Sequence, residues 1–165
     1  MTREEFVQAK QFAFADIRRE LALARACASA TGTAVLSSVG IPLGGGNFLA
    51  ALGLLCYTEF GGKLRYDCKR SDGREHASEN FNRFFDDLGT QYMSLRTARH
   101  NVYDIFRCGL AHEYYVKRAC TIVMVYPGVD AGIVVDASGR YVFVVEKYCD
   151  DLERQFDALE TELFP

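Results

Sequence analysis

The sequence has no excess of basic residues, no pair of cysteines at the spacing of a metal or redox motif, and no long uninterrupted apolar run. Its 19 lysines and arginines face 22 aspartates and glutamates, which gives a net charge of -3. Broad counterion release from nucleic acid requires a basic surface, so this balance excludes a general nucleic-acid coat protein and leaves only local contacts. The six cysteines are scattered, and we expect them to be reduced thiols in a cytoplasmic protein.

The longest stretch without a charged residue, 26–58, does not have the pattern of a membrane span. Ser37, Pro42 and the glycines at 44–46 interrupt it before it reaches the ~20 apolar residues that a transmembrane helix needs. The charged start at 3–10 does not resemble a secretory signal. The triple glycine is not followed by the lysine of a phosphate-binding loop, so we interpret it as a flexible lead-in to a helix with Asn47 as N-cap.

Apolar residues at helical spacing predict a single, mainly helical domain over residues 1–165. A capping box formed by Thr2 and Glu5 favours an early helix start. In the first half of the chain we expect a helix over 3–28, a loop or short helix over 31–46, a buried helix over 48–60 ended by Gly61-Gly62, and a polar loop over 63–75. In the second half we expect helices over 79–95, from Thr97 to about 115, and from about 147 onward. The helix over 79–95 carries an aromatic stripe, which we interpret as core or dimer surface rather than a nucleobase platform.

Three short β-branched runs precede the last helix. They cover residues 122–126, 132–136 and 141–145, and turn residues separate them at 127–128 and 137–139. This pattern predicts a small antiparallel three-stranded β-meander, inserted at about 119–146 in a four- to five-helix bundle.

The helix that ends near residue 115 carries the candidate chemistry. On an α-helix of ~3.6 residues per turn, Arg107 and His112 diverge by about 140° and flank a strip of short side chains that includes Asp104 and Cys108. A fixed positive charge beside a group that titrates near neutrality suits phosphoryl chemistry. The alternative is that both residues only complement the helix dipole. The predicted core stripe opposite them comprises Val102, Ile105, Phe106, Gly109 and Leu110.

Two further residues bear on this site. Glu59, near the end of the buried helix 48–60, is either exposed beyond the core or paired with an arginine such as Arg107. Cys108 and His112, four residues apart, could share a metal, but no second pair stands at ligand spacing, so we expect no metal site and no cofactor.

The segment from Tyr103 to Tyr114 resembles the signature helix of the HEPN superfamily, small helical bundles that include many RNases of toxin–antitoxin, abortive-infection and CRISPR systems. The family's mark is an arginine, four to six residues, and a histidine, matched here by Arg107 and His112. The toxins of HEPN–nucleotidyltransferase pairs add a tyrosine two residues later, matched by Tyr114. The segment 59–64 also resembles the family's second helix. Cys108 departs from the polar residue that usually follows the arginine.

The resemblance implies metal-independent cleavage of RNA by attack of the ribose 2′-hydroxyl, with Arg107 holding the phosphate and His112 moving the proton. It also implies a homodimer that brings two motifs to one cleft. Tyr114 would be a wall of that cleft, a target that a nucleotidyltransferase antitoxin modifies, or simply an aromatic packed on the meander. The departure at Cys108 keeps open a second reading, a non-catalytic dimer that binds nucleotide, RNA or a partner protein, and a third, a helical interaction module without a ligand.

Overall fold

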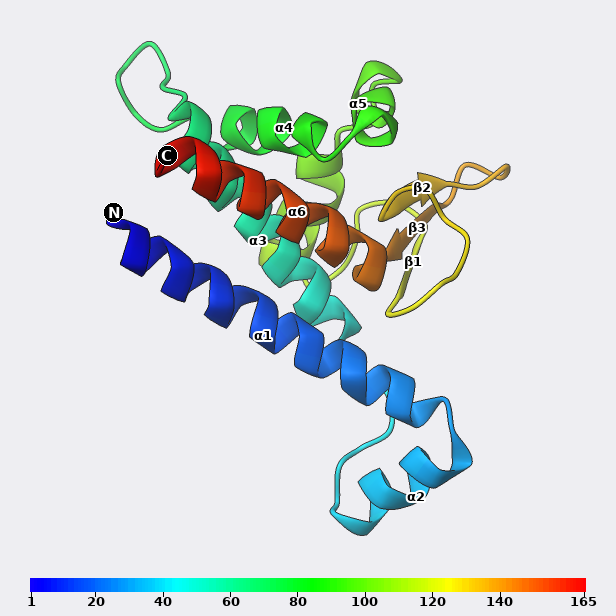
Figure 1. Ribbon diagram of the computed structural model, residues 1–165. Helices are drawn as coiled ribbons and strands as arrows, with labels where there is room; N and C mark the ends of the chain where they lie inside the picture. Colours follow the sequence, from blue (N-terminus) through cyan, green and yellow to red (C-terminus); the bar gives the residue numbers. More distant parts are fainter.

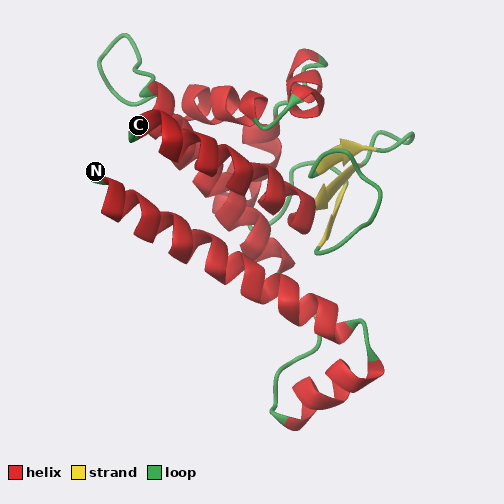
Figure 2. Cartoon of the chain, in the orientation of Figure 1, coloured by secondary structure: helices red, strands yellow, loops and turns green.

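A computed structural model describes residues 1–165 as a helical body with a small sheet at one side (Figures 1 and 2). This confirms the mainly helical fold with three strands before the last helix. The elements are α1 (Arg3–Cys27), α2 (Ala30–Ser38), α3 (Asn47–Tyr66), α4 (Ala77–Asp87), α5 (Thr90–Thr97), the π-helix η1 (Tyr103–Glu113), β1 (Cys120–Val123), β2 (Ile133–Val135), β3 (Tyr141–Val144) and α6 (Val145–Leu163).

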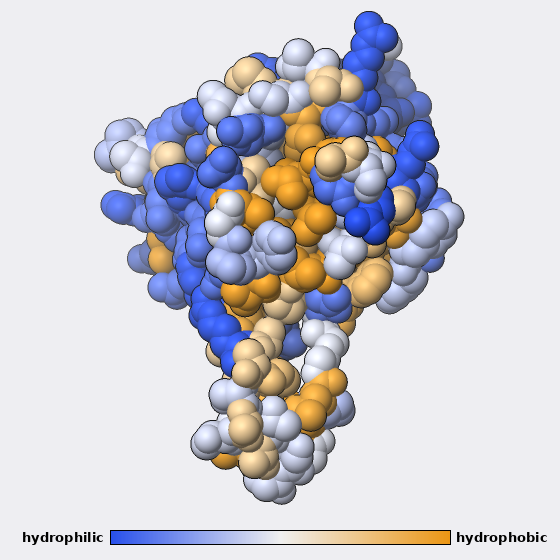
Figure 3. All heavy atoms as spheres, turned by 90° about the vertical axis from the view of Figure 1, so that its right-hand side faces the viewer, coloured by the Kyte–Doolittle hydropathy of each residue, from blue (hydrophilic) through white to orange (hydrophobic).

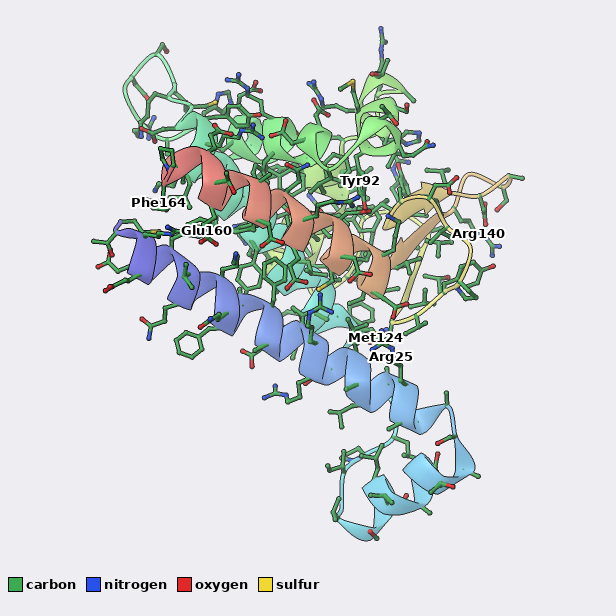
Figure 4. The ribbon with its side chains drawn as sticks, in the orientation of Figure 1. Arg25, Tyr92, Met124, Arg140, Glu160 and Phe164 are labelled. Carbon is green, nitrogen blue, oxygen red and sulfur yellow. The ribbon has the colours of Figure 1, made fainter.

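Helices α1 and α6 lie side by side along one face of the body (Figure 1). The expected capping box is present, because Thr2 accepts from the Glu5 amide and Glu5 accepts from the Thr2 amide. Ion pairs join the two helices along their length. Glu160 projects from α6 toward α1 (Figure 4), where Lys10 lies 2.5 Å from it.

Helix α3 is the buried centre, and it runs past the glycine pair that was expected to end it. A Cβ on Gly61 would lie 2.5 Å from the Phe84 ring, and one on Gly62 would collide with the backbone of Asn80. The two glycines therefore let α4 pack closely against α3 and do not cap the helix, which ends at Asp67 in a left-handed conformation. The expectation of an Asn47 N-cap is also wrong.

The aromatic segment expected as one helix is two. Gly89, at φ 143°, breaks it between α4 and α5. The aromatic stripe lies in the core, as expected: it comprises Phe81, Phe84, Phe85 and Tyr92. The Tyr92 hydroxyl donates to the buried carboxylate of Asp151 at 2.6 Å and accepts from the Gly132 amide at 2.7 Å, which ties α5 to α6 and to the sheet.

The sheet has the order β1-β3-β2, and β1 pairs with β3 in parallel while β2 pairs with β3 antiparallel. The expectation of an antiparallel meander is therefore wrong in topology. The reason is the connection after β1: residues 124–132 form a loop that carries the chain to the far edge of β3 and not a tight hairpin turn. Only the turn at Asp136–Arg140 is tight, with Asp136 accepting from the Ser138 and Arg140 amides.

Helix α2 forms an arm that extends away from the body (Figure 1) and contacts mainly α1. It is the short-helix alternative of the two expectations for this segment. In the space-filling view the arm lacks strongly hydrophilic residues (Figure 3), and Val35 and Val39 are exposed. No helix of the protein combines the length and the apolar character that a membrane crossing requires.

Candidate functional site

The motif lies on η1, which is a π-helix and not the expected α-helix over 97–115. Thr97 closes α5 instead of capping the motif helix, and the chain turns at residues 98–102 before η1 begins. The core face is nevertheless as predicted from the sequence. All five stripe residues are buried: Val102, Ile105, Phe106, Gly109 and Leu110.

The π-helical winding changes how the two candidate catalytic residues relate. The hydrogen bonds of a π-helix join residues five apart, so such residues occupy the same side of adjacent turns. Arg107 and His112 are five apart, and η1 spans both. The divergence of about 140° calculated for an α-helix therefore does not apply.

Arg107 is held by Glu59 of α3. The guanidinium Nε lies 2.8 Å from the Glu59 carboxylate, and the two side chains are 20% and 19% exposed. The contact is an ion pair without hydrogen-bond geometry, since both atoms are buried and neither completes a hydrogen bond. Burial is the largest influence on Arg107 and lowers its pKa, but Glu59 together with Cys56, Tyr103 and Cys108 outweighs it, so the pKa of Arg107 lies above its usual value. Of the two sequence-based alternatives for Glu59, pairing with Arg107 is the one observed.

Tyr103 and Cys56 complete this cluster, and sequence reasoning missed both. The Arg107 guanidinium carbon lies 5.9 Å from the centre of the Tyr103 ring, a distance compatible with a cation–π contact. Burial, together with the charge of Glu59, raises the pKa of Tyr103 to about 12. Burial also raises the pKa of Cys56, although the Arg107 charge acts in the opposite direction. The sequence does contain one signal for them, their spacing on the expected helices. Tyr103 is four residues before Arg107 and Cys56 is three before Glu59, so each would lie next to its partner on one helix face.

The remaining predicted residues lie around this cluster in different environments. His112 is exposed, and Cys108 is half-buried with a free thiol. Asp104 is exposed and bound to Lys117 at 2.8 Å, so it does not share the ion pair of Arg107. Tyr114 ends η1 at φ 57° and is 75% exposed, so it is not packed on the sheet.

Arg107 and His112 line none of the five best-defined hollows of the surface. No three histidine, cysteine or acidic side chains converge as metal ligands would. What the single chain offers is a clamped guanidinium and an exposed imidazole on the same helix.

Comparison of the chain with protein-family models, with curated proteins and with solved structures found no match.

Proposed function

We propose that the protein is a metal-independent endoribonuclease of the HEPN type, whose active site forms where two copies of the chain meet. The observation that carries the proposal is the location of Arg107 and His112 five residues apart on a π-helix, the one helical geometry that brings such a pair to one side. Their residue types match the Arg-x4-His pattern of the resemblance, and Tyr114 extends that match.

The proposed chemistry is internal transesterification. The ribose 2′-oxygen forms a bond to the adjacent phosphorus while the bond from phosphorus to the 5′-oxygen breaks. One imidazole takes the proton of the 2′-hydroxyl and a protonated group delivers one to the leaving oxygen, so the products are a 2′,3′-cyclic phosphate and a 5′-hydroxyl. His112 is suited to this role because it is exposed and makes no hydrogen bond that would occupy its ring.

Arg107 would stabilise the charge that develops on the phosphate oxygens. Its ion pair with Glu59 supports this role. A guanidinium has five N–H donors, and Glu59 approaches the Nε side, while the two terminal amino groups form no hydrogen bond within the protein. In this proposal Glu59 is a positioning residue: it fixes the orientation of the Arg107 guanidinium and leaves the two terminal amino groups free to bind phosphate.

We place the site between two copies because Arg107 and His112 line none of the five best-defined hollows of the single chain. Juxtaposition of two η1 helices would supply both imidazoles and both guanidiniums to one cleft. The exposed hydroxyl of Tyr114 would remain reachable by a modifying nucleotidyltransferase antitoxin. The six unpaired thiols fit a cytoplasmic location.

A second candidate function is a non-catalytic dimer that binds RNA, a nucleotide or a partner protein. Two observations favour it. Glu59 already neutralises Arg107 within the chain, and Cys108 supplies a thiol, a weak hydrogen-bonding group, at the position after the arginine.

Cleavage of a labelled single-stranded RNA in the presence of EDTA separates the two candidates. We expect cleavage by the unmodified protein, with 5′-hydroxyl ends that accept phosphate from polynucleotide kinase, and a loss of about 10²- to 10⁴-fold in Arg107→Ala and His112→Ala. The matched controls are Arg70→Ala and His76→Ala, which remove the same residue types outside η1 and should cleave normally. RNA binding without cleavage would support the second candidate, and cleavage that survives both η1 changes would exclude this site.

A further inference from the structure

A basic hollow lies beside the start of η1, and its lining includes neither Arg107 nor Glu59. It has a volume of about 590 Å³ and is formed where the turn before η1, the segment after η1 and the β2–β3 turn meet. Its charged and aromatic lining consists of Arg99, His100, Asp104, Lys117, Arg118 and Tyr141. Three fixed cations and a histidine thus gather in a protein whose net charge is -3.

Two of the three cations of this hollow are not compensated within the chain. The third, Lys117, is paired with Asp104 at 2.8 Å and with Glu113 at 3.4 Å. Other arginines nearby in sequence have their own acids, as Arg96 has Asp86. Arg99 and Arg118, in contrast, form no ion pair, and both are exposed. Two guanidiniums without partners therefore face a concave surface.

The lining is also held in place. The Nδ1 atom of His100 and the Tyr141 hydroxyl lie 2.6 Å apart, which fixes the imidazole against the start of β3. Gly109 permits the segment after η1 to fold back over the helix, because a Cβ there would lie 2.6 Å from the Tyr115 carbonyl oxygen. The Lys117 amide then donates to the Ile105 carbonyl at 3.1 Å. Lys117 and Arg118 consequently face the hollow from a fixed backbone.

Arg99 is placed by an uncommon backbone conformation. Its φ of 65° lies in the left-handed region, which residues other than glycine seldom adopt. That conformation closes the turn between α5 and η1 and directs the chain so that Arg99 and His100 both line the hollow. If position 99 served only to form the turn, glycine would adopt this φ more easily than arginine does.

We propose that this hollow binds a phosphate group of a single-stranded RNA, outside the position where the strand is cut. Guanidinium forks match phosphate oxygens in bidentate geometry, and the hydrogen-bonded His100–Tyr141 pair adds a further donor. The choice of RNA as the source of the phosphate rests on the proposed function. Because Arg107 is not part of its lining, the hollow would hold the substrate and the reaction would remain at the motif.

Binding is measured by fluorescence anisotropy with a labelled 2′-O-methyl RNA, which cannot be cleaved by 2′-hydroxyl attack. We expect Arg99→Ala combined with Arg118→Ala to weaken binding at least tenfold and to flatten the dependence of affinity on salt, because each lost phosphate contact reduces counterion release. Arg99→Gly is a second variant that accepts the left-handed φ and removes only the side chain. Arg70→Ala, an exposed arginine outside the hollow, is the matched control.

The outcomes separate this inference from the proposed function. RNA binding that depends on Arg99 and Arg118 in a protein that cleaves nothing supports the hollow and contradicts the nuclease. Normal cleavage and unchanged affinity in the double variant overturn the hollow alone. Direct binding of millimolar inorganic phosphate or AMP that is lost in the double variant, with RNA affinity unaffected by the variants, would assign the hollow to a free phosphate or nucleotide and also overturn the RNA proposal.

Discussion

The Nε atom of Arg107 lies 2.8 Å from the carboxylate of Glu59, and this ion pair joins η1 to the buried helix α3. The motif helix is thereby tied to the centre of the fold at the residue that the proposed chemistry needs most. Tyr103 and Cys56 enclose the pair, so the guanidinium is shielded from solvent on the inner side.

Replacement of Glu59 by glutamine tests whether this ion pair stabilises the fold. Glu59→Gln keeps the shape of the side chain but leaves the charge of Arg107 without its partner, so we expect the free energy of unfolding to fall by about 1–3 kcal/mol. Urea unfolding measures the change. If Glu59 positions the guanidinium, the variant should also cleave RNA with a lower kcat and a smaller change in KM.

Glu75→Gln is the control for this experiment. It breaks the ion pair of Glu75 with Lys63, which is 2.6 Å long but lies at the surface. Surface pairs contribute little to stability, so this variant should unfold like the unmodified protein. Equal stability of Glu59→Gln and Glu75→Gln would show that the pair on η1 is not structural.

Gly62 should not tolerate even a methyl group. In Gly62→Ala the added Cβ would collide with the Asn80 backbone, and a backbone cannot rotate away as a side chain can. We expect a loss of at least about 1–3 kcal/mol in the free energy of unfolding. Gly53→Ala, on the same helix, is the control: its Cβ would meet Ile17 at 3.4 Å, an ordinary contact. Similar melting temperatures for the two variants would contradict the close packing of α3 and α4.

The stability of the protein should fall in alkaline solution through two of its thiols, that of the buried Cys149 and that of the half-buried Cys120. Burial raises the pKa of Cys149 to about 12 and that of Cys120 to about 11, from 9.0. A raised pKa in the folded state means that the contribution to stability is complete below pH 9 and is lost as the pH rises toward the folded value. We expect the free energy of unfolding to decline from pH 9 to about 12.

Cys149→Ala isolates this effect from the titration of tyrosines. It removes the buried thiol at a cost that is the same at every pH, so the decline above pH 9 should be shallower than in the unmodified protein. Cys27→Ala, at a half-buried position at the end of α1, should leave the slope unchanged. Parallel pH profiles for Cys149→Ala and the unmodified protein would rule out the assignment.

The sequence predicts those parts of the fold that local patterns determine. The apolar period and the Thr2–Glu5 capping box give α1 almost to the residue. The glycines at 61–62 have the local pattern of a helix end, and only the approach of α4, distant in sequence, shows that they serve packing. The parallel pairing of β1 with β3 likewise depends on where a loop carries the chain, which β-branched runs do not specify.

For the candidate site, the sequence predicts one of the two alternatives for Glu59 that the structure shows, its pairing with Arg107, but not the geometry of the helix that carries Arg107 and His112. The π-helical winding does not follow from the sequence, because the buried stripe of η1 has the same residues in an α-helical wheel. The raised pKa of Tyr103 depends on burial and the position of Arg99 on a turn, and neither is predicted by the sequence pattern.

The most direct test of the central claim, that two copies pool Arg107 and His112 in one cleft, is a mixed-subunit cleavage assay. Arg107→Ala and His112→Ala chains carry different affinity tags, are produced together, and the mixed dimer is isolated by both tags. The account predicts that each variant alone is inactive and that the mixed dimer, with one arginine and one histidine in its cleft, regains measurable RNA cleavage in EDTA. A mixed dimer as inactive as its parents, or a chain that stays monomeric while it cleaves, would contradict the account.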